Sequence, residues 1–112
     1  MWRLGLFFAL LASGCASNVG PDGIAVGGPC ADEFDCLTGS YCLRGFDYPS
    51  GVCTTNCRAS ADCRGESVCA DVEGGVCLLS CAVDEDCART GYSCRELDMR
   101  GATGRVSACT GR

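Results

Sequence analysis

The number and spacing of the cysteines constrain this chain more than any other feature. Thirteen of its 112 residues are cysteine, and twelve of them form three successive sets of four with nearly equal spacing. The sets are Cys30, Cys36, Cys42 and Cys53; Cys57, Cys63, Cys69 and Cys77; and Cys81, Cys87, Cys94 and Cys109. A cysteine content of about 12% in a short chain is typical of a disulfide scaffold. We therefore expect all twelve to form disulfides, which persist outside the cytoplasm.

Other residues recur with the cysteines. An Asp precedes the second cysteine of every set (Asp35, Asp62 and Asp86), and a Gly lies between the second and third (Gly39, Gly65 and Gly91). Such self-similarity predicts tandem copies of one unit. We place repeat 1 at 30–56, repeat 2 at 57–80 and repeat 3 at 81–112.

The segment between the third and fourth cysteines varies most in length and is rich in turn residues, which predicts a hairpin with a variable loop. The five-residue segments between the other cysteines are too short for a stable helix. We therefore predict a small disulfide-rich fold of tandem loop-and-hairpin knots, with short β-strands and little regular secondary structure.

Four cysteines can pair in three ways. Within each repeat we favour first with third and second with fourth, because crossed bridges pin a hairpin onto its leading loop. Pairing across the three-residue joints between repeats, such as Cys53 with Cys57, is geometrically feasible as well.

The thirteenth cysteine, Cys15, follows a basic start, an apolar stretch at 4–11 and three small residues at 12–14. The apolar stretch is too short to span a bilayer, which needs about 20 residues, and the pattern is that of a secretory signal peptide. It resembles the lipobox of bacterial lipoproteins, except that Ala12 stands where that family usually has Leu. The resemblance implies that residues 1–14 are removed and that Cys15 is acylated, with palmitate among the acyl chains. The alternative is an ordinary signal peptide that is cut elsewhere.

Residues 15–29 are dominated by Gly, Pro, Ser, Asn and Asp and show no periodicity. This composition predicts a flexible, lipidated tether. The acyl chains would hold the protein on a membrane. Under the sorting rule of enterobacterial lipoproteins, which the lipobox resemblance brings in, Ala16 in place of Asp implies the outer membrane over the inner one. We thus expect a lipid-anchored protein of the bacterial cell envelope or extracellular surface.

The cysteine spacing from Cys30 to Cys109, with its Asp and Gly positions, resembles the Dickkopf N-terminal cysteine-rich region. The resemblance implies a disulfide-linked, short-stranded extracellular module. It does not carry over the receptor antagonism of the animal proteins, because their partner-contacting surface has no counterpart in this sequence.

Composition disfavours several function classes. The chain has no His, which is the commonest general base and metal ligand, and no closely spaced Cys pair of the zinc or thioredoxin type. Removing residues 1–14 removes Arg3 and changes the formal charge from −5 to −6, which disfavours nucleic acid as a partner. We therefore expect no enzyme activity, no cofactor and no metal.

Calcium is the metal alternative that the sequence leaves open. Acidic residues cluster before the second cysteine in repeats 1 and 3, at Asp32, Glu33 and Asp35, and at Asp84, Glu85 and Asp86. The Gly and closing Glu of an EF-hand loop are missing. We favour a structural role, in which the recurring Asp accepts hydrogen bonds from backbone N–H groups and sets a turn.

Aromatic residues concentrate in repeat 1, at Phe34, Tyr41, Phe46 and Tyr48. They form either a binding face or the core of a thin fold, and we take Phe46 and Tyr48 as candidate binding residues. We predict a membrane-anchored, non-enzymatic binding or structural module of the cell envelope, with its acyl chains in the membrane and an envelope or extracellular protein as partner. The alternative is a secreted disulfide-rich inhibitor or toxin-like domain that presents the loop 44–50.

Overall fold

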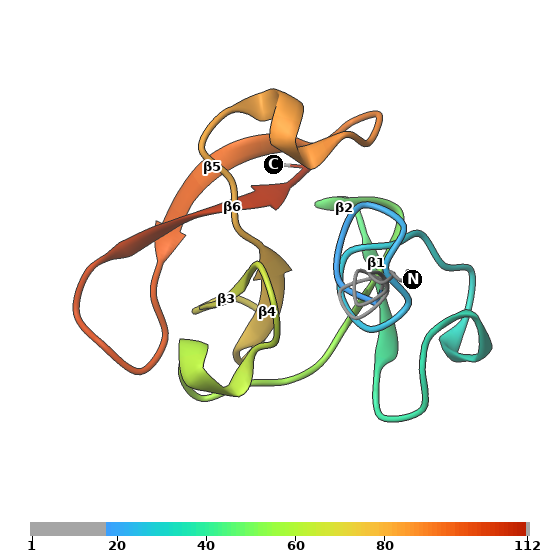
Figure 1. Ribbon diagram of the computed structural model, residues 1–112, viewed down its shortest axis with the longest axis horizontal. Coiled ribbons are helices and arrows are strands. Elements are labelled where there is room, and N and C mark those ends of the chain that lie inside the picture. The colour runs from blue at the N-terminus through green and yellow to red at the C-terminus, as the bar shows by residue number, and fades with distance from the viewer. Residues whose placement is uncertain (1–17, 112) are drawn as a thin grey trace, which may run out of the picture.

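The computed structural model describes residues 18–111 and confirms a small disulfide-rich fold. The predicted signal peptide at 1–14 and the predicted lipidation site at Cys15 lie outside the described residues. Three two-stranded antiparallel sheets follow one another along the chain, and a single turn of 3-10 helix precedes each of them (Figure 1). Among the described residues, no helix is long and apolar enough to cross a membrane.

Each repeat has the same plan: a 3-10 turn lies between the first two cysteines, and a hairpin carries the last two. The 3-10 turns are η2 (Glu33–Asp35), η3 (Ser60–Asp62) and η4 (Asp84–Cys87). The hairpins are β1 (Tyr41–Gly45) with β2 (Tyr48–Thr54), β3 (Ser67–Ala70) with β4 (Val76–Leu79), and β5 (Ser93–Asp98) with β6 (Arg105–Thr110). The segment of variable length forms the hairpin loop, as the turn residues predict.

Six disulfides join the first cysteine to the third and the second to the fourth in every repeat, which confirms the favoured pairing. They are Cys30–Cys42, Cys36–Cys53, Cys57–Cys69, Cys63–Cys77, Cys81–Cys94 and Cys87–Cys109. The third and fourth cysteines of a repeat lie opposite each other on the hairpin. Both bridges therefore run from neighbouring positions on the hairpin to the leading loop.

The joints between repeats continue the strands. Thr54 belongs to β2, and its buried hydroxyl donates to the carbonyl oxygen of Cys77 at 2.6 Å. Two residues later, Asn56 forms an antiparallel bridge with Val76 of β4, and at the second joint Ser80 forms one with Ala108 of β6. The ends of repeats 1 and 2 thus pair with the closing strand of the repeat that follows, which fixes the relative arrangement of neighbouring repeats.

Residues 18–29 differ from the predicted flexible tether, because they pack on the folded core. Ala25 and Val26 are only 3% and 1% exposed. Gly27 and Gly28 exchange backbone hydrogen bonds with Cys53, both at 2.9 Å. A side chain on Gly27 would overlap the carbonyl oxygen of Gly20 and the side chain of Leu79. The glycines that suggested flexibility instead allow the backbone to pack closely.

The core is shared by the three repeats. One buried cluster joins Val26 and Leu79 to disulfides of repeats 2 and 3. The other joins Tyr48 of repeat 1 to Leu78 of repeat 2 and Ala108 of repeat 3. The repeats therefore form one packed body.

Arg89 ties repeat 3 back to the beginning of the fold. Its guanidinium donates to the carbonyl oxygens of Gly27 at 3.1 Å, Pro49 at 3.2 Å and Gly51 at 2.8 Å, and lies 4.4 Å from the centre of the Tyr92 ring. The hydroxyl of Tyr92 also donates to the carbonyl oxygen of Pro49, at 3.0 Å. In most repeat proteins each unit contacts only its neighbours, whereas here the third repeat contacts the first.

Candidate functional site

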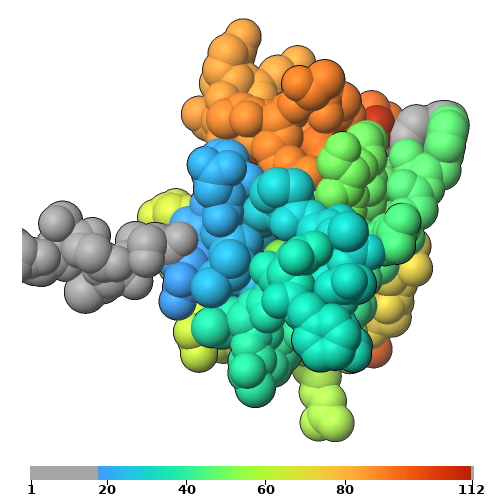
Figure 2. Space-filling view, turned by 90° about the vertical axis from the view of Figure 1, so that its right-hand side faces the viewer, coloured from blue at the N-terminus to red at the C-terminus, as the bar shows by residue number. Residues whose placement is uncertain are grey.

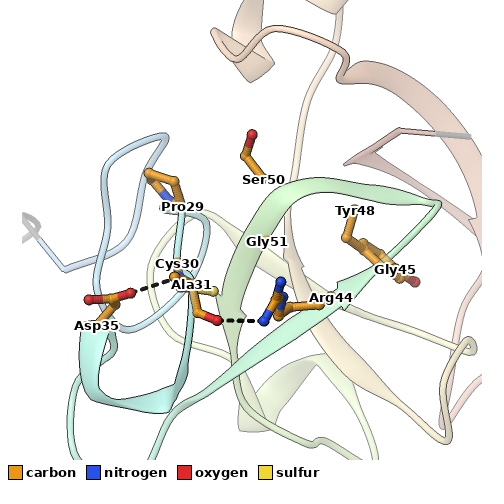
Figure 3. Close-up of a pocket in the computed structure, with 9 residues that line it drawn as sticks. All are labelled: Pro29, Cys30, Ala31, Asp35, Arg44, Gly45, Tyr48, Ser50 and Gly51. Atoms are coloured by element: carbon orange, nitrogen blue, oxygen red, sulfur yellow. Dashed lines mark hydrogen bonds between the residues drawn. The ribbon is translucent and has the colours of Figure 1, made fainter.

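The candidate site is an open hollow of about 590 Å³ in repeat 1, between the leading loop and the β1–β2 hairpin (Figure 3). Its walls come from the first disulfide, the turn that carries η2, and both strands of the hairpin. The lining residues are Pro29, Cys30, Ala31, Asp35, Arg44, Gly45, Tyr48, Ser50 and Gly51.

Two side chains of opposite charge hold the peptide groups of Ala31. The carboxylate of Asp35 accepts from the amide of Ala31 at 2.7 Å, and the guanidinium of Arg44 donates to its carbonyl oxygen at 2.8 Å (Figure 3). Arg44 thereby ties β1 to the leading loop. An arginine has five N–H donors, so its exposed guanidinium also has donors to offer to a ligand.

The recurring Asp forms the predicted turn in all three repeats. Its carboxylate accepts from the amides four and three residues earlier, and the shorter of the two bonds measures 2.7 Å in repeat 1, 2.9 Å in repeat 2 and 2.8 Å in repeat 3. These backbone N–H bonds hold the pKa of Asp35 and of Asp86 below the usual value. The role that we favoured for this residue is confirmed.

The calcium alternative finds no further support in the neighbouring carboxylates. Asp32 accepts from the amide of Phe34 at 2.9 Å, and Asp84 accepts from the amide of Cys94 at 2.8 Å. Both carboxylates thus take part in local structure. Among the described residues, the groups that approach metal-ligand spacing consist of cysteine sulfurs, and these are in disulfides.

Repeats 2 and 3 have hollows that are also lined by the first cysteine, the next residue and the recurring Asp. The hollow of repeat 2 further includes Glu73 and Gly74 of its own hairpin loop and Arg100 of repeat 3. The hollow of repeat 3 includes Glu66 and Ser80 of repeat 2 and no residue of the β5–β6 hairpin. The leading turn therefore borders a hollow in every repeat, and the opposite wall differs from one repeat to the next.

The two predicted binding residues have opposite environments. Phe46, in the turn of the hairpin, is 78% exposed, whereas Tyr48 is only 5% exposed and packs in the shared core. Burial raises the pKa of Tyr48 to about 12. Tyr48 is therefore mainly a core residue, which is one of the two roles that the sequence left open: it begins β2, where its ring packs with Val52. Only a small part of its side chain contributes to the lining of the hollow.

Phe34 is an exposed aromatic that we did not select as a binding residue. It lies in η2 and is 88% exposed. Its position in the repeat holds Ala61 in repeat 2 and Glu85 in repeat 3. This difference between the repeats could have identified Phe34 from the sequence as a candidate binding residue, because an aromatic side chain found in only one copy is not required by the shared fold.

Phe34 and Phe46 are each next in sequence to a residue that lines the hollow. Phe34 directly precedes Asp35, which lines the wall of the leading loop, and Phe46 directly follows Gly45, which lines the hairpin wall. The candidate site thus consists of a hollow with an arginine, and two of its lining residues have an exposed phenylalanine as their sequence neighbour.

No protein-family model, curated protein or solved structure matches the chain.

Proposed function

We propose that the protein is a lipid-anchored, non-enzymatic binding module of the bacterial cell envelope, and that the hollow of repeat 1 binds a protein partner. The main support for this binding site is the pair of exposed phenylalanines, which lie on loops that disulfides hold in place. Aromatic residues and arginine are enriched in the cores of protein interfaces. The anchor rests on the lipobox-like sequence that ends at Cys15.

The hairpin turn is held in place before any partner binds. The carbonyl oxygen of Asp47 accepts from the amide of Gly111 at 2.8 Å and from the hydroxyl of Thr110 at 3.3 Å. A loop that is ordered in the free protein loses little conformational entropy on binding. The partner surface that fits this site combines an apolar patch for the two rings with a carboxylate for Arg44.

The intact mass of the protein from the membrane fraction tests the anchor. We expect a mass that begins at Cys15 and carries acyl chains, with twelve thiols that react only after reduction. An unacylated chain in the membrane fraction would contradict the anchor.

Site-specific photo-crosslinking in intact cells tests the binding site. We expect a crosslinker at position 46 to give a discrete product with an envelope or extracellular protein, and Phe34→Ser to reduce its yield. The matched control is position 95, because Arg95 is exposed on β5 and forms no ion pair within residues 18–111. Equal labelling from both positions would contradict a specific surface on repeat 1.

The same pinned hairpin favours a second function, that of a secreted inhibitor which presents the loop 44–50 to its target. Under this proposal Phe46 would enter a pocket of the target, whereas Tyr48 would act only by supporting the loop. An unacylated protein in the culture medium would favour this function over the anchored one.

A further inference from the structure

The described chain is ordered almost from the predicted anchor onwards. Asn18 accepts hydrogen bonds through its carbonyl oxygen from the amides of Ala25 at 2.9 Å and Val26 at 3.1 Å. Val19 pairs with Val26 and lies beside Gly65 of repeat 2. The first described residues are therefore part of the packed body.

This arrangement leaves very little chain between the body and Cys15. Only residues 16 and 17 separate Cys15 from Asn18. A fully extended chain advances about 3.3–3.6 Å per residue, so the Cα atoms of Cys15 and Asn18 are within roughly 11 Å of each other. A flexible tether of 14 residues would have a root-mean-square length of about 20 Å.

A bilayer has a hydrocarbon core of about 30 Å and a total thickness of about 40–45 Å, which leaves roughly 5–8 Å for the headgroups on each side. With acyl chains on Cys15, a link of at most roughly 11 Å leaves Asn18 no more than about 3–6 Å beyond a headgroup layer of this depth. We propose, on the basis of the lipid anchor proposed above, that the body rests directly on the membrane, with residues 18–24 and the adjoining Arg64 and Gly65 facing the lipid headgroups.

The chemistry of this face suits a lipid surface. Ile24 is 42% exposed, and its carbonyl oxygen accepts from the amide of Leu37 at 2.8 Å, which places it on ordered backbone. Arg64 is exposed and forms no ion pair with any described residue, so that its guanidinium is available for a headgroup phosphate. Ala25, which follows Ile24, and Arg64 line the same hollow, and an exposed apolar side chain together with an arginine is a combination that occurs at membrane surfaces.

The short link, and not net charge, brings this face to the membrane. The described residues carry seven arginines against fourteen acidic residues, since Arg3 and Arg112 lie outside them, and their formal charge is −7. An anionic bilayer repels a body of this charge. The covalent link overcomes this repulsion because it keeps the face at a high effective concentration near the lipid.

Part of the β1–β2 hairpin extends away from this face. Figure 2 shows the beginning of the described chain, in blue, on one side of the molecule and green residues of the hairpin on the opposite side, although Cys53 in β2 bonds to Gly27 and Gly28. A body that rests on residues 18–24 would therefore present this part of the hairpin to the space beyond the membrane.

Tryptophan fluorescence tests the contact, because Trp2 is the only tryptophan and lies in the predicted signal peptide. We would purify the Ile24→Trp and Phe46→Trp variants as lipoproteins and reconstitute each into vesicles of phosphatidylethanolamine and phosphatidylglycerol that contain lipid brominated near the headgroup. We expect loss of emission from position 24 and unchanged emission from position 46. A Gly-Ser spacer of about 14 residues after Ser17 should restore the emission from position 24, because it adds roughly 20 Å of reach.

The intact mass of each sample separates the two proposals. With acylated Cys15, equal emission from positions 24 and 46 would overturn the contact and leave the anchor in place. Quenching at position 24 that persists with the spacer would overturn the role of the short link. A mass without acyl chains would reject the anchor and, with it, the contact.

Discussion

Replacing Arg89 by alanine should loosen the contact between repeats 3 and 1 while leaving every disulfide in place. The guanidinium donates to the carbonyl oxygens of Gly27, Pro49 and Gly51, and it stacks on the ring of Tyr92. Gly27 and Gly51 are buried. Their carbonyl groups would therefore lose a hydrogen-bond partner without free access to water.

The magnitude follows from these contacts. A hydrogen bond to a charged group contributes about 1.5–3 kcal/mol, but Arg89 is only half-buried, and water can replace part of each bond. We therefore take about 1 kcal/mol for each of the three bonds, near the general value for hydrogen bonds in proteins. The contact with Tyr92 adds about 0.5 kcal/mol, which gives a total loss of about 3.5 kcal/mol in the free energy of unfolding. Arg89→Lys keeps the charge but lacks the planar fork that reaches separate acceptors, so it should lose most of this amount.

Denaturant unfolding of the oxidised protein measures the loss, and amide hydrogen exchange locates it. Faster exchange should appear at 47–51 and 89–92, where the two repeats meet. The matched control is Arg95→Ala, an exposed arginine of the same repeat, which should cost less than about 0.5 kcal/mol. Equal effects of the two variants would refute the reasoning, because they would show that the Arg89 contacts contribute nothing to the packing of repeat 3 against repeat 1.

The remaining predictions concern the turns and the segment before repeat 1. The backbone N–H bonds hold the pKa of Asp35 and Asp86 below their usual 3.8 in the folded state. The stabilising effect of these bonds is therefore complete above about pH 5 and is lost as the pH falls through the lowered pKa. Unfolding curves between pH 5 and pH 2, taken as approximate limits around the ordinary aspartate pKa, should therefore fall less steeply for Asp35→Asn and Asp86→Asn, and an unchanged slope would contradict this role. Gly51→Ala should lower the yield of oxidative refolding more than Gly39→Ala. Both positions have positive φ, but only at Gly51 would the new Cβ overlap the carbonyl oxygen of Cys30, and equal yields would argue against the overlap. Val26→Ala should cost about 1–2 kcal/mol in denaturant unfolding, since it removes buried methyl groups, whereas a flexible tether would tolerate the change without loss.

The local structure of each repeat could be predicted from the sequence, because its determinants are close together in the chain. Four cysteines, an Asp and a few turn residues specify the hairpin and the crossed bridges. The Asp turn at positions such as 31–35 depends on contacts within five residues. Short-range patterns of this kind are visible without knowledge of the rest of the fold.

The arrangement between repeats could not be predicted, because its contacts join distant residues of ordinary type. Arg89 meets Gly27 across 62 positions, and nothing in the spacing of the cysteines marks that arginine. The segment 18–29 was misjudged because glycine is common both in flexible linkers and where backbones pack closely. Phe46 and Tyr48 are two positions apart, yet the hairpin exposes one and buries the other, which composition alone does not reveal.

The confinement of each disulfide to one repeat has a consequence for proteolysis. No bridge among the six spans residues 54–56 or 78–80, so a single peptide-bond cleavage at either joint would divide the chain into fragments with no covalent connection. Those fragments would stay together only through the shared core, the paired strands and Arg89. Despite its dense cross-linking, the protein can therefore be divided at these two joints. The burial of Thr54, Leu78 and Leu79 protects the joints from cleavage.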